Sequence, residues 1–167
     1  MKKSTNNLFS HEEILSLFDY DSVNGSLIWR ASMPPKGKIG AIAGTICKNG
    51  YVTIGIKGKR FYAHRLVWIH QTGLWPNEDI DHIDGNPSNN KLENLRIGTD
   101  SQNMQNLKKS HSDNISGFLG VERKRHRWMA RIMASGKRLT LGTFDTPEEA
   151  HAAYISAKRV LHSFNTL

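Results

Sequence analysis

The chain has 167 residues, a length that suits one ordinary domain or two small ones. Its formal charge of +8 fits a polyanionic partner, and residues 109–167 are the more basic part, with ten Lys and Arg against five Asp and Glu. The single cysteine, Cys47, excludes an intrachain disulfide. Without an apolar run of about 20 residues or a signal-peptide pattern, the sequence predicts a cytoplasmic protein that does not contact a membrane.

The residue pattern of the first 80 positions predicts short helices and hairpins. Ser10 and Glu13 have the spacing of a capping box, which predicts the start of a short helix. The segment FDYDSVNGSLIWR predicts a β-hairpin with Asn24-Gly25 in its turn. The segment NGYVTIGIKGKRFYAHRLVW predicts two strands joined by a Lys57-Gly58 turn, followed by a helix from about residue 64 to residue 71.

Residues 81–106 read DHIDGNPSNNKLENLRIGTDSQNMQN and predict a strand, a turn-rich loop, a second strand and a helix. Their candidate functional residues are Asp81, His82, Asn94 and Asn103. Thr99 and Gln102 have capping-box spacing, which would place Asn103 in the first turn of the helix. A strand, a loop, a strand and a helix can bring Asp81 and Asn103 to one point, and that point has the chemistry of a metal site.

This stretch resembles the HNH nucleases, also called ββα-metal or His-Me finger nucleases, in the subgroup found in phage and intron-encoded homing endonucleases. The DH pair, the NNxxxNLR spacing and the closing QNxxN agree in order and distance. The resemblance implies that His82 is the general base that activates water, and that Asp81 and Asn103 bind one divalent cation. It also implies that Asn94 holds the loop and the histidine through hydrogen bonds. Asn103 stands where the family's name has histidine, so the metal preference does not transfer.

The same chemistry follows from the residue types. Hydrolysis of a phosphodiester needs an electrophile at the leaving oxygen, which a bound cation supplies. A carboxylate and a carboxamide oxygen suit Mg²⁺ best, with Mn²⁺ or another transition metal as alternatives. A histidine near neutral pH can accept the proton of water. The alternative is a purely structural hairpin turn, in which Asp81 and Asp84 cap loops and His82 packs against its neighbours.

The segment AHRLVW resembles the helix that precedes the DH pair in these nucleases. That position would bring Arg65 near the active centre, where it could contact phosphate or form a surface ion pair. His64 and His70 are six residues apart and lie on different faces of the predicted helix, so neither is expected to bind metal.

Residues 107–116 are polar and without apolar periodicity, which predicts a linker between a nuclease module at 1–106 and a second module at 117–167. The second module predicts three strands, GFLGVE, RWMARIM and KRLTLGTF, and a helix with Thr146 as its N-cap. Alternation along the middle strand turns Trp128, Ala130 and Ile132 to one side and arginines and methionines to the other.

Seven Lys and Arg and no acidic residue occur between positions 123 and 138, which predicts a basic sheet face that contacts DNA. A merely soluble exposed face is the alternative. The candidate DNA-binding residues of this module are Arg123, Lys124, Arg125, Arg127, Arg131, Arg138 and Thr140.

The second module resembles the plant APETALA/ethylene-response-factor (ERF) DNA-binding domain, which also occurs appended to HNH nucleases. The residues that carry the resemblance are GV at 120–121, WxAxI at 128–132, LGTFDTPEEA at 141–150 and AY at 153–154. The resemblance implies that the sheet lies in the major groove, with Arg131 and Arg138 at contacting positions. Glu122, Met133 and Thr140 replace the arginine or tryptophan of plant members, so their target sequence does not transfer.

The sequence therefore predicts an α+β protein, in which a ββα-metal HNH nuclease module precedes a three-stranded antiparallel sheet packed on one helix. The predicted function is metal-dependent, site-preferring cleavage of double-stranded DNA by a phage-encoded enzyme in the host cytoplasm. Two alternatives stay open, a non-catalytic DNA-binding regulator with a retired nuclease fold and a nuclease that acts only inside a complex. Monomer and homodimer are both open as well.

Overall fold

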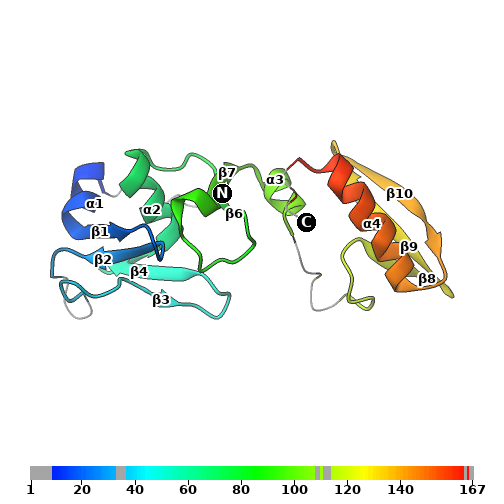
Figure 1. The fold of residues 1–167 in the computed structure, drawn as a ribbon, viewed down its shortest axis with the longest axis horizontal. Coiled ribbons are helices and arrows are strands. Elements are labelled where there is room, and N and C mark those ends of the chain that lie inside the picture. Colours follow the sequence, from blue (N-terminus) through cyan, green and yellow to red (C-terminus); the bar gives the residue numbers. More distant parts are fainter. Residues whose placement is uncertain (1–8, 33–36, 108–109, 111–113, 164, 166–167) are drawn as a thin grey trace. The chain divides into compact units, whose positions relative to one another are not determined.

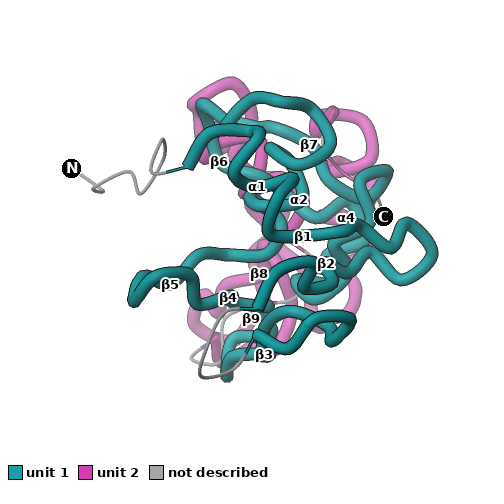
Figure 2. Tube along the Cα trace, turned by 90° about the vertical axis from the view of Figure 1, so that its left-hand side faces the viewer, with its two compact units in different colours: residues 1–99 teal, residues 100–167 magenta. Residues whose placement is uncertain are grey.

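The structure, a computed structural model, describes residues 9–32, 37–107, 110, 114–163 and 165. The chain divides into two units, residues 1–99 and 100–167, and each combines helices with strands (Figures 1 and 2). The fold class is therefore α+β, as predicted. The N-terminal eight residues and most of the centre of the predicted linker, 108–109 and 111–113, lie outside the described residues. No helix in the described part of the chain is long and apolar enough to span a membrane.

Helix α1 (His11–Leu17) starts at the predicted capping box. The Ser10 hydroxyl accepts a hydrogen bond from the Glu13 backbone N–H at 3.2 Å, and the Glu13 carboxylate accepts one from the Ser10 N–H at 2.8 Å. These bonds satisfy two backbone donors that the first turn would otherwise leave unpaired. The helix turns Ile14 into the interior, where that side chain is fully buried.

The predicted hairpin consists of β1 (Phe18–Asp21) and β2 (Ser26–Trp29), which pair antiparallel. Its turn ends at Gly25, whose φ of +67° favours glycine. A Cβ at Gly25 would lie 2.4 Å from the backbone nitrogen of Lys91. The glycine therefore lets the hairpin approach the backbone of the loop that precedes β7.

A second sheet follows, with the strand order β3 (Thr45–Ile46), β4 (Val52–Ile56) and β5 (Lys59–Tyr62). The predicted turn joins β4 to β5 at Lys57 and Gly58, both with positive φ, as a tight two-residue hairpin requires. The chain then enters α2 (Ala63–Thr72), which ends at Gly73 in the left-handed conformation. This helix begins and ends within one residue of its predicted bounds.

One apolar core joins these elements. Its buried members are Phe9, Ile14, Phe18, Leu27, Trp29, Ala43, Ile54, Ile56, Phe61, Ala63, Leu66, Val67, Ile69, Ile80 and Leu95. Because α1, both sheets and α2 all contribute, removal of any one large side chain would leave a cavity and cost about 2–5 kcal/mol. Ile80 and Leu95 extend the core to the next hairpin, so that hairpin has a rigid support.

The hairpin that carries the candidate site is formed by β6 (Asp79–His82) and β7 (Leu95–Gly98), which pair antiparallel. A 3-10 turn, η1 (Leu92–Asn94), was not predicted and leads directly into β7. Helix α3 (Asp100–Gln105) follows β7 and belongs to the second unit. The predicted order of strand, loop, strand and helix is therefore present.

The second unit contains a three-stranded antiparallel sheet and a helix. The sheet has the order β10 (Lys137–Phe144), β9 (Arg127–Ala134) and β8 (Val121–Lys124), and α4 (Pro147–Leu161) lies along one of its faces (Figure 1). Helix α4 starts at the predicted capping box of Thr146 and Glu149. A Cβ at Gly120 would lie 2.0 Å from the ring of Tyr154, so the segment before β8 packs closely on the helix only because glycine stands there.

A β-bulge between Thr140 and Gly142 was not predicted. It shifts the register of β10, so that Phe144 pairs with Trp128 and both pack near the helix. Leu141, at the bulge, is half-buried against the same cluster. Simple alternation along the strand cannot show a bulge, because the extra residue changes which side chains share a face.

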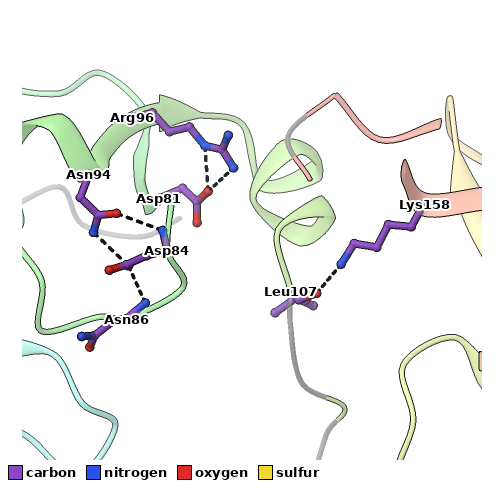
Figure 3. A network of polar contacts seen from close by, with 7 residues as sticks. All are labelled: Asp81, Asp84, Asn86, Asn94, Arg96, Leu107 and Lys158. Carbon is purple, nitrogen blue, oxygen red and sulfur yellow. Dashed lines mark hydrogen bonds and ion pairs between the residues drawn. The ribbon is translucent and has the colours of Figure 1, made fainter. Parts of the chain in front are cut away.

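Lys158 of α4 is 1% exposed, which is unusual for a lysine. Its ammonium donates a hydrogen bond to the backbone carbonyl of Leu107 (Figure 3). It also lies 5.9 Å from the centre of the Tyr154 ring. Both contacts compensate the ammonium for water lost on burial. The lysine thereby joins the segment after α3 to α4 within the second unit.

Candidate functional site

Asp81 and His82 are adjacent on β6 and face opposite sides of the hairpin, as neighbours in a strand do. Asp81 lies opposite Arg96 of β7, whose Nε and Nη2 donate to Asp81 Oδ2 at 3.0 and 2.8 Å (Figure 3). The contact is half-buried, so it fixes the direction of the carboxylate better than an exposed ion pair would. Sequence reasoning used the arginine only as part of the NLR spacing and gave it no role.

His82 is buried, and Asn90 sets the position of its ring. His82 Nε2 lies 3.2 Å from Asn90 Oδ1, and Asn90 Nδ2 donates to the Ser88 carbonyl at 3.2 Å. Since the amide nitrogen of Asn90 is used in that way, its oxygen accepts from the histidine, and Nε2 carries the proton. Nδ1 is then the nitrogen able to accept a proton. Asn90 was missed by sequence reasoning, although it lies in the NN pair of the recognised spacing.

Two aromatic rings contact the histidine, and a third stacks on one of them. The ring of His64 meets that of His82 edge to face at 5.1 Å, Tyr51 lies 5.8 Å from His82, and Tyr62 stacks on His64 at 5.3 Å. Burial lowers the pKa of His82 below its usual value and lowers the pKa of His64 to about 3. Both rings are therefore neutral near pH 7. His64 Nδ1 is buried and has no hydrogen-bond partner among the described residues.

Asn94, the middle residue of the motif, binds the loop between β6 and η1. Its Nδ2 donates to Asp84 Oδ1 at 3.0 Å, and its Oδ1 accepts from the Asp84 N–H at 3.0 Å (Figure 3). Its Nδ2 also donates to the Asn89 carbonyl at 2.8 Å. Burial alone would raise the pKa of Asp84, but hydrogen bonds from Asn89, Asn86 and Asn94 outweigh it and lower that pKa. Asn94 thus closes the loop, whereas Asn90 makes the side-chain contact with His82.

The N-terminal hairpin supports this loop from outside. The Tyr20 hydroxyl accepts a hydrogen bond from the Leu92 N–H at 2.9 Å and donates one to the Asn90 carbonyl at 3.5 Å. Together with the close approach of Gly25 to Lys91, these contacts fix the backbone from Asn90 to Leu92. The hairpin therefore helps to position the histidine's partner, although it carries no candidate catalytic residue.

Arg65 lies on α2 and is half-buried. Its guanidinium donates to the carbonyls of Pro76 at 3.0 Å and Glu78 at 3.3 Å, which fixes the segment leading into β6. Burial lowers the pKa of Arg65, although the group stays charged at any working pH.

Asn103, the second predicted metal ligand, lies on α3.

The described residues contain no cluster of three or more His, Cys, Asp or Glu side chains that could hold a metal ion. The predicted ligand pair is smaller and chemically different, one carboxylate and one carboxamide. Such a set fits Mg²⁺, which commonly binds one or two carboxylates and completes its shell with water and substrate phosphate oxygens.

The outer face of the second unit's sheet points away from α4. Strand register places Lys124, Arg127, Arg131, Arg138 and Thr140 on this face. Arg123 instead lies opposite Trp128, on the face of the helix, and stands 5.6 Å from the ring centre of that tryptophan. Arg125 lies in the turn between β8 and β9, with a φ of +57°. The structure thus gathers five of the seven candidates on one surface.

Two family profiles match the chain, one in each of its two regions. A family profile described as HNH endonuclease matches residues 61–105, and one described as AP2 domain matches residues 116–163. Protein 3.8 of Escherichia phage T7 is 36% identical over 111 residues, which are 62% of this chain and 90% of that protein. The chain belongs to the HNH endonuclease family.

The chain is also similar to an HNH homing endonuclease with a solved structure. DNA endonuclease I-HmuI of Bacillus phage SP01 is 42% identical over 76 residues, and the match covers 42% of this chain and 44% of that protein. The chain therefore spans less than half the length of that relative. A solved structure of DNA binding and cleavage by the HNH homing endonuclease I-HmuI aligns with a TM-score of 0.40 and 33% identity, over 53% of this chain and 49% of that one.

Proposed function

We propose that this protein is a metal-dependent DNA endonuclease that hydrolyses phosphodiester bonds, with site preference aided by its C-terminal sheet. The observation that carries the proposal is the hydrogen bond between His82 and Asn90 in a buried setting. It orients a neutral imidazole with its proton on Nε2 and its basic lone pair on Nδ1, which is the state a general base requires.

His82 Nδ1 takes the proton of the attacking water in this mechanism. Asn90 holds the tautomer and the ring orientation, and the rings of His64 and Tyr51 exclude bulk water around the histidine. Asn94 keeps the loop closed through its bonds to Asp84 and Asn89, so the histidine's partner cannot drift. General-base catalysis of this kind contributes about 10²–10⁴-fold in rate.

Asp81 and Asn103 would hold one divalent cation, Mg²⁺ by preference, with Mn²⁺ as an alternative. Their oxygens are hard ligands, which is the class that both ions favour. Arg96 keeps the Asp81 carboxylate oriented and partly neutralised. When bound, the cation supplies charge stabilisation at the leaving oxygen of the phosphodiester.

Double-stranded DNA is the proposed substrate and partner. The AP2 match and the basic outer face of β8–β10 support binding of DNA by the second unit. The lysine and arginines of that face would contact phosphates and bases, and Arg65 would assist near the cleavage site. Phosphate contacts supply most of the affinity, and base contacts supply the preference for a site.

Incubation of the full chain with supercoiled plasmid and Mg²⁺, Mn²⁺ or EDTA tests the proposal. We expect nicked or linear product with either ion and none with EDTA. His82→Ala should abolish cleavage while binding persists, because a general base acts on the chemical step and not on docking. His126→Ala, which removes an exposed histidine in the β8–β9 turn, is the matched control and should cut at the wild-type rate at saturating DNA.

A DNA-binding regulator without catalytic activity is the second candidate, because an AP2 domain by itself accounts for DNA binding. The two candidates differ in one measurement. Wild-type protein that binds DNA but cuts no DNA with Mg²⁺ or Mn²⁺ would favour the regulator.

A further inference from the structure

The outer face of β8–β10 carries lysine and arginine side chains together with one acid from the strands themselves. Among the residues of the three strands, Glu122 is the only acid, and it lies on the same face as Lys124 and Arg127. Arg131 Nη1 donates to Glu122 Oε2 at 2.9 Å. The carboxylate thus lies on the edge strand β8, beside lysine and arginine side chains that attract a polyanion.

Neither stability nor phosphate binding accounts for this carboxylate. Glu122 is half exposed, and ion pairs at exposed sites typically contribute about 0–1 kcal/mol to stability. A carboxylate on a face that meets DNA repels phosphates and weakens attraction to the backbone. The position of Glu122 on this face is consistent with a contact to DNA bases, because base edges include hydrogen-bond donors that a carboxylate can accept.

The chemistry of the pair matches one base pair. In the major groove, cytosine presents its N4 amino group as a donor, which glutamate accepts, and guanine presents O6 and N7 as acceptors, which arginine contacts with two donors. The N4 and O6 atoms of a C·G pair lie next to each other, because they are hydrogen-bonded partners. An acceptor and a donor held 2.9 Å apart on the protein therefore face a donor and an acceptor held at a similar spacing on the DNA.

The surroundings of the pair leave room for such a contact. A cavity of about 230 Å³ lies beside it, lined in part by Asn114, Met133 and Arg138. Arg131 Nε is buried and has no hydrogen-bond partner among the described residues. The Glu122 contact therefore satisfies only part of the guanidinium.

We propose that Glu122 and Arg131 read one C·G base pair as a unit, with Glu122 accepting from cytosine N4 and Arg131 donating to guanine O6 and N7. This inference rests on the proposed function, since it takes DNA binding by the outer face as given. It assigns Glu122 a specificity-determining role and predicts that one position of the preferred site is C·G in a fixed orientation.

The test uses the full chain with His82→Ala, so that bound DNA is not cut. Selection from a random DNA pool identifies the preferred site, and competition with every single-base variant measures the preference at each position. Glu122→Ala should lower the preference for C·G at one position by about fivefold or more. Its affinity for random DNA should stay equal or rise, because a negative charge has been removed. Glu148→Ala, which removes an exposed acid from the first turn of α4, should leave every position unchanged.

Two further measurements show whether the residues act together. Arg131→Ala should lose the preference at the same position, and the double variant should lose no more there than either single variant does. Replacement of the guanine at that position by 7-deazaguanine should weaken binding of the parent chain several-fold and leave the Arg131→Ala variant nearly unaffected.

The possible results separate this inference from the function on which it rests. A parent chain that binds no DNA overturns the proposed function and the inference with it. A parent chain that binds DNA without base preference, or a Glu122→Ala variant whose preferences equal those of the parent at every position, overturns the inference alone. A double variant that loses the product of the two single effects shows that the residues read separate bases.

Discussion

The histidine site of the first unit and the basic face of the second unit use polar side chains in opposite ways. His82, Asn90 and Asn94 are each less than one-tenth exposed, and each is hydrogen-bonded to a residue in the same loop or at its end. On the outer face of β8–β10, four of the five residues gathered there are exposed, and the fifth, Arg131, is half-buried. A group that moves a proton must be oriented before the substrate arrives, whereas groups that meet phosphates need reach and charge. We therefore expect replacements in the buried histidine site to cost more activity than single replacements on the exposed basic face.

Asn103 gives the sharpest test of this division, because it lies on a helix of the second unit but is proposed to act in catalysis. Asn103→Ala should be nearly inactive with every metal, since the cation would lose an oxygen ligand. Asn103→His should retain cleavage and gain more with Ni²⁺ or Co²⁺ than wild type does, because imidazole suits borderline ions. Cleavage rates with each metal ion measure this. An alanine variant that cuts like wild type with Mg²⁺ would remove Asn103 from the ligand set.

Replacement of Asn90 tests whether orientation within the buried site matters. Asn90→Ala should lower kcat on the order of 100-fold with little change in DNA affinity, because His82 loses the acceptor that fixes its tautomer. Asn89→Ala is the matched control, since that side chain donates to Asp84 and not to His82. It should lower kcat by less than tenfold. Equal losses in the two variants would assign the effect to the loop as a whole.

The pH dependence of stability sharpens the contrast, because the buried site contains a histidine that stays neutral in the folded state. His64 has a pKa of about 3 when folded and about 6.5 when unfolded, so the unfolded chain binds its proton more readily. Its contribution to stability is complete above pH 6.5 and falls as the pH decreases, by about 1.4 kcal/mol per pH unit. Between pH 6.5 and pH 5 the expected loss is about 2 kcal/mol.

Urea unfolding followed by tryptophan fluorescence measures this loss, since three of the four tryptophans lie in the first unit. His64→Phe keeps an aromatic ring next to His82 but removes the titrating group, so its stability should depend less on pH. Identical pH profiles for wild type and variant would show that His64 does not titrate on unfolding in this range.

The smallest expected effect comes from single charges on the exposed region. Lys124→Ala should reduce the slope of log K against log salt concentration by about 1, because one phosphate contact is lost. Arg123→Ala removes a charge from the preceding residue of the same strand, whose side chain lies on the helix side of the sheet. Its slope should change less. Binding titrations at several salt concentrations measure both, and equal changes would mean that the strand register does not decide which side meets DNA.

Local patterns in the sequence determined most secondary structure. The capping boxes at Ser10 and Thr146 and the two-residue turn at Lys57-Gly58 formed as predicted, because each depends on residues within a few positions. The family was also recognisable from spacing alone, and the HNH and AP2 matches confirm it. The β10 bulge escaped prediction because nothing local distinguishes it from regular alternation.

Tertiary structure decided which polar side chains meet. Spacing placed Asn94 in the motif, yet it is the Asn90 amide that lies 3.2 Å from His82 Nε2, because the closed loop turns that amide toward the ring. Register across β6 and β7 paired Asp81 with Arg96, and the packing of α2 against the hairpin buried His64 beside the proposed base. A one-residue change of register moves a side chain to the other face of a strand, and only the assembled sheet fixes that register. The same reason separates Arg123 from Lys124 on β8.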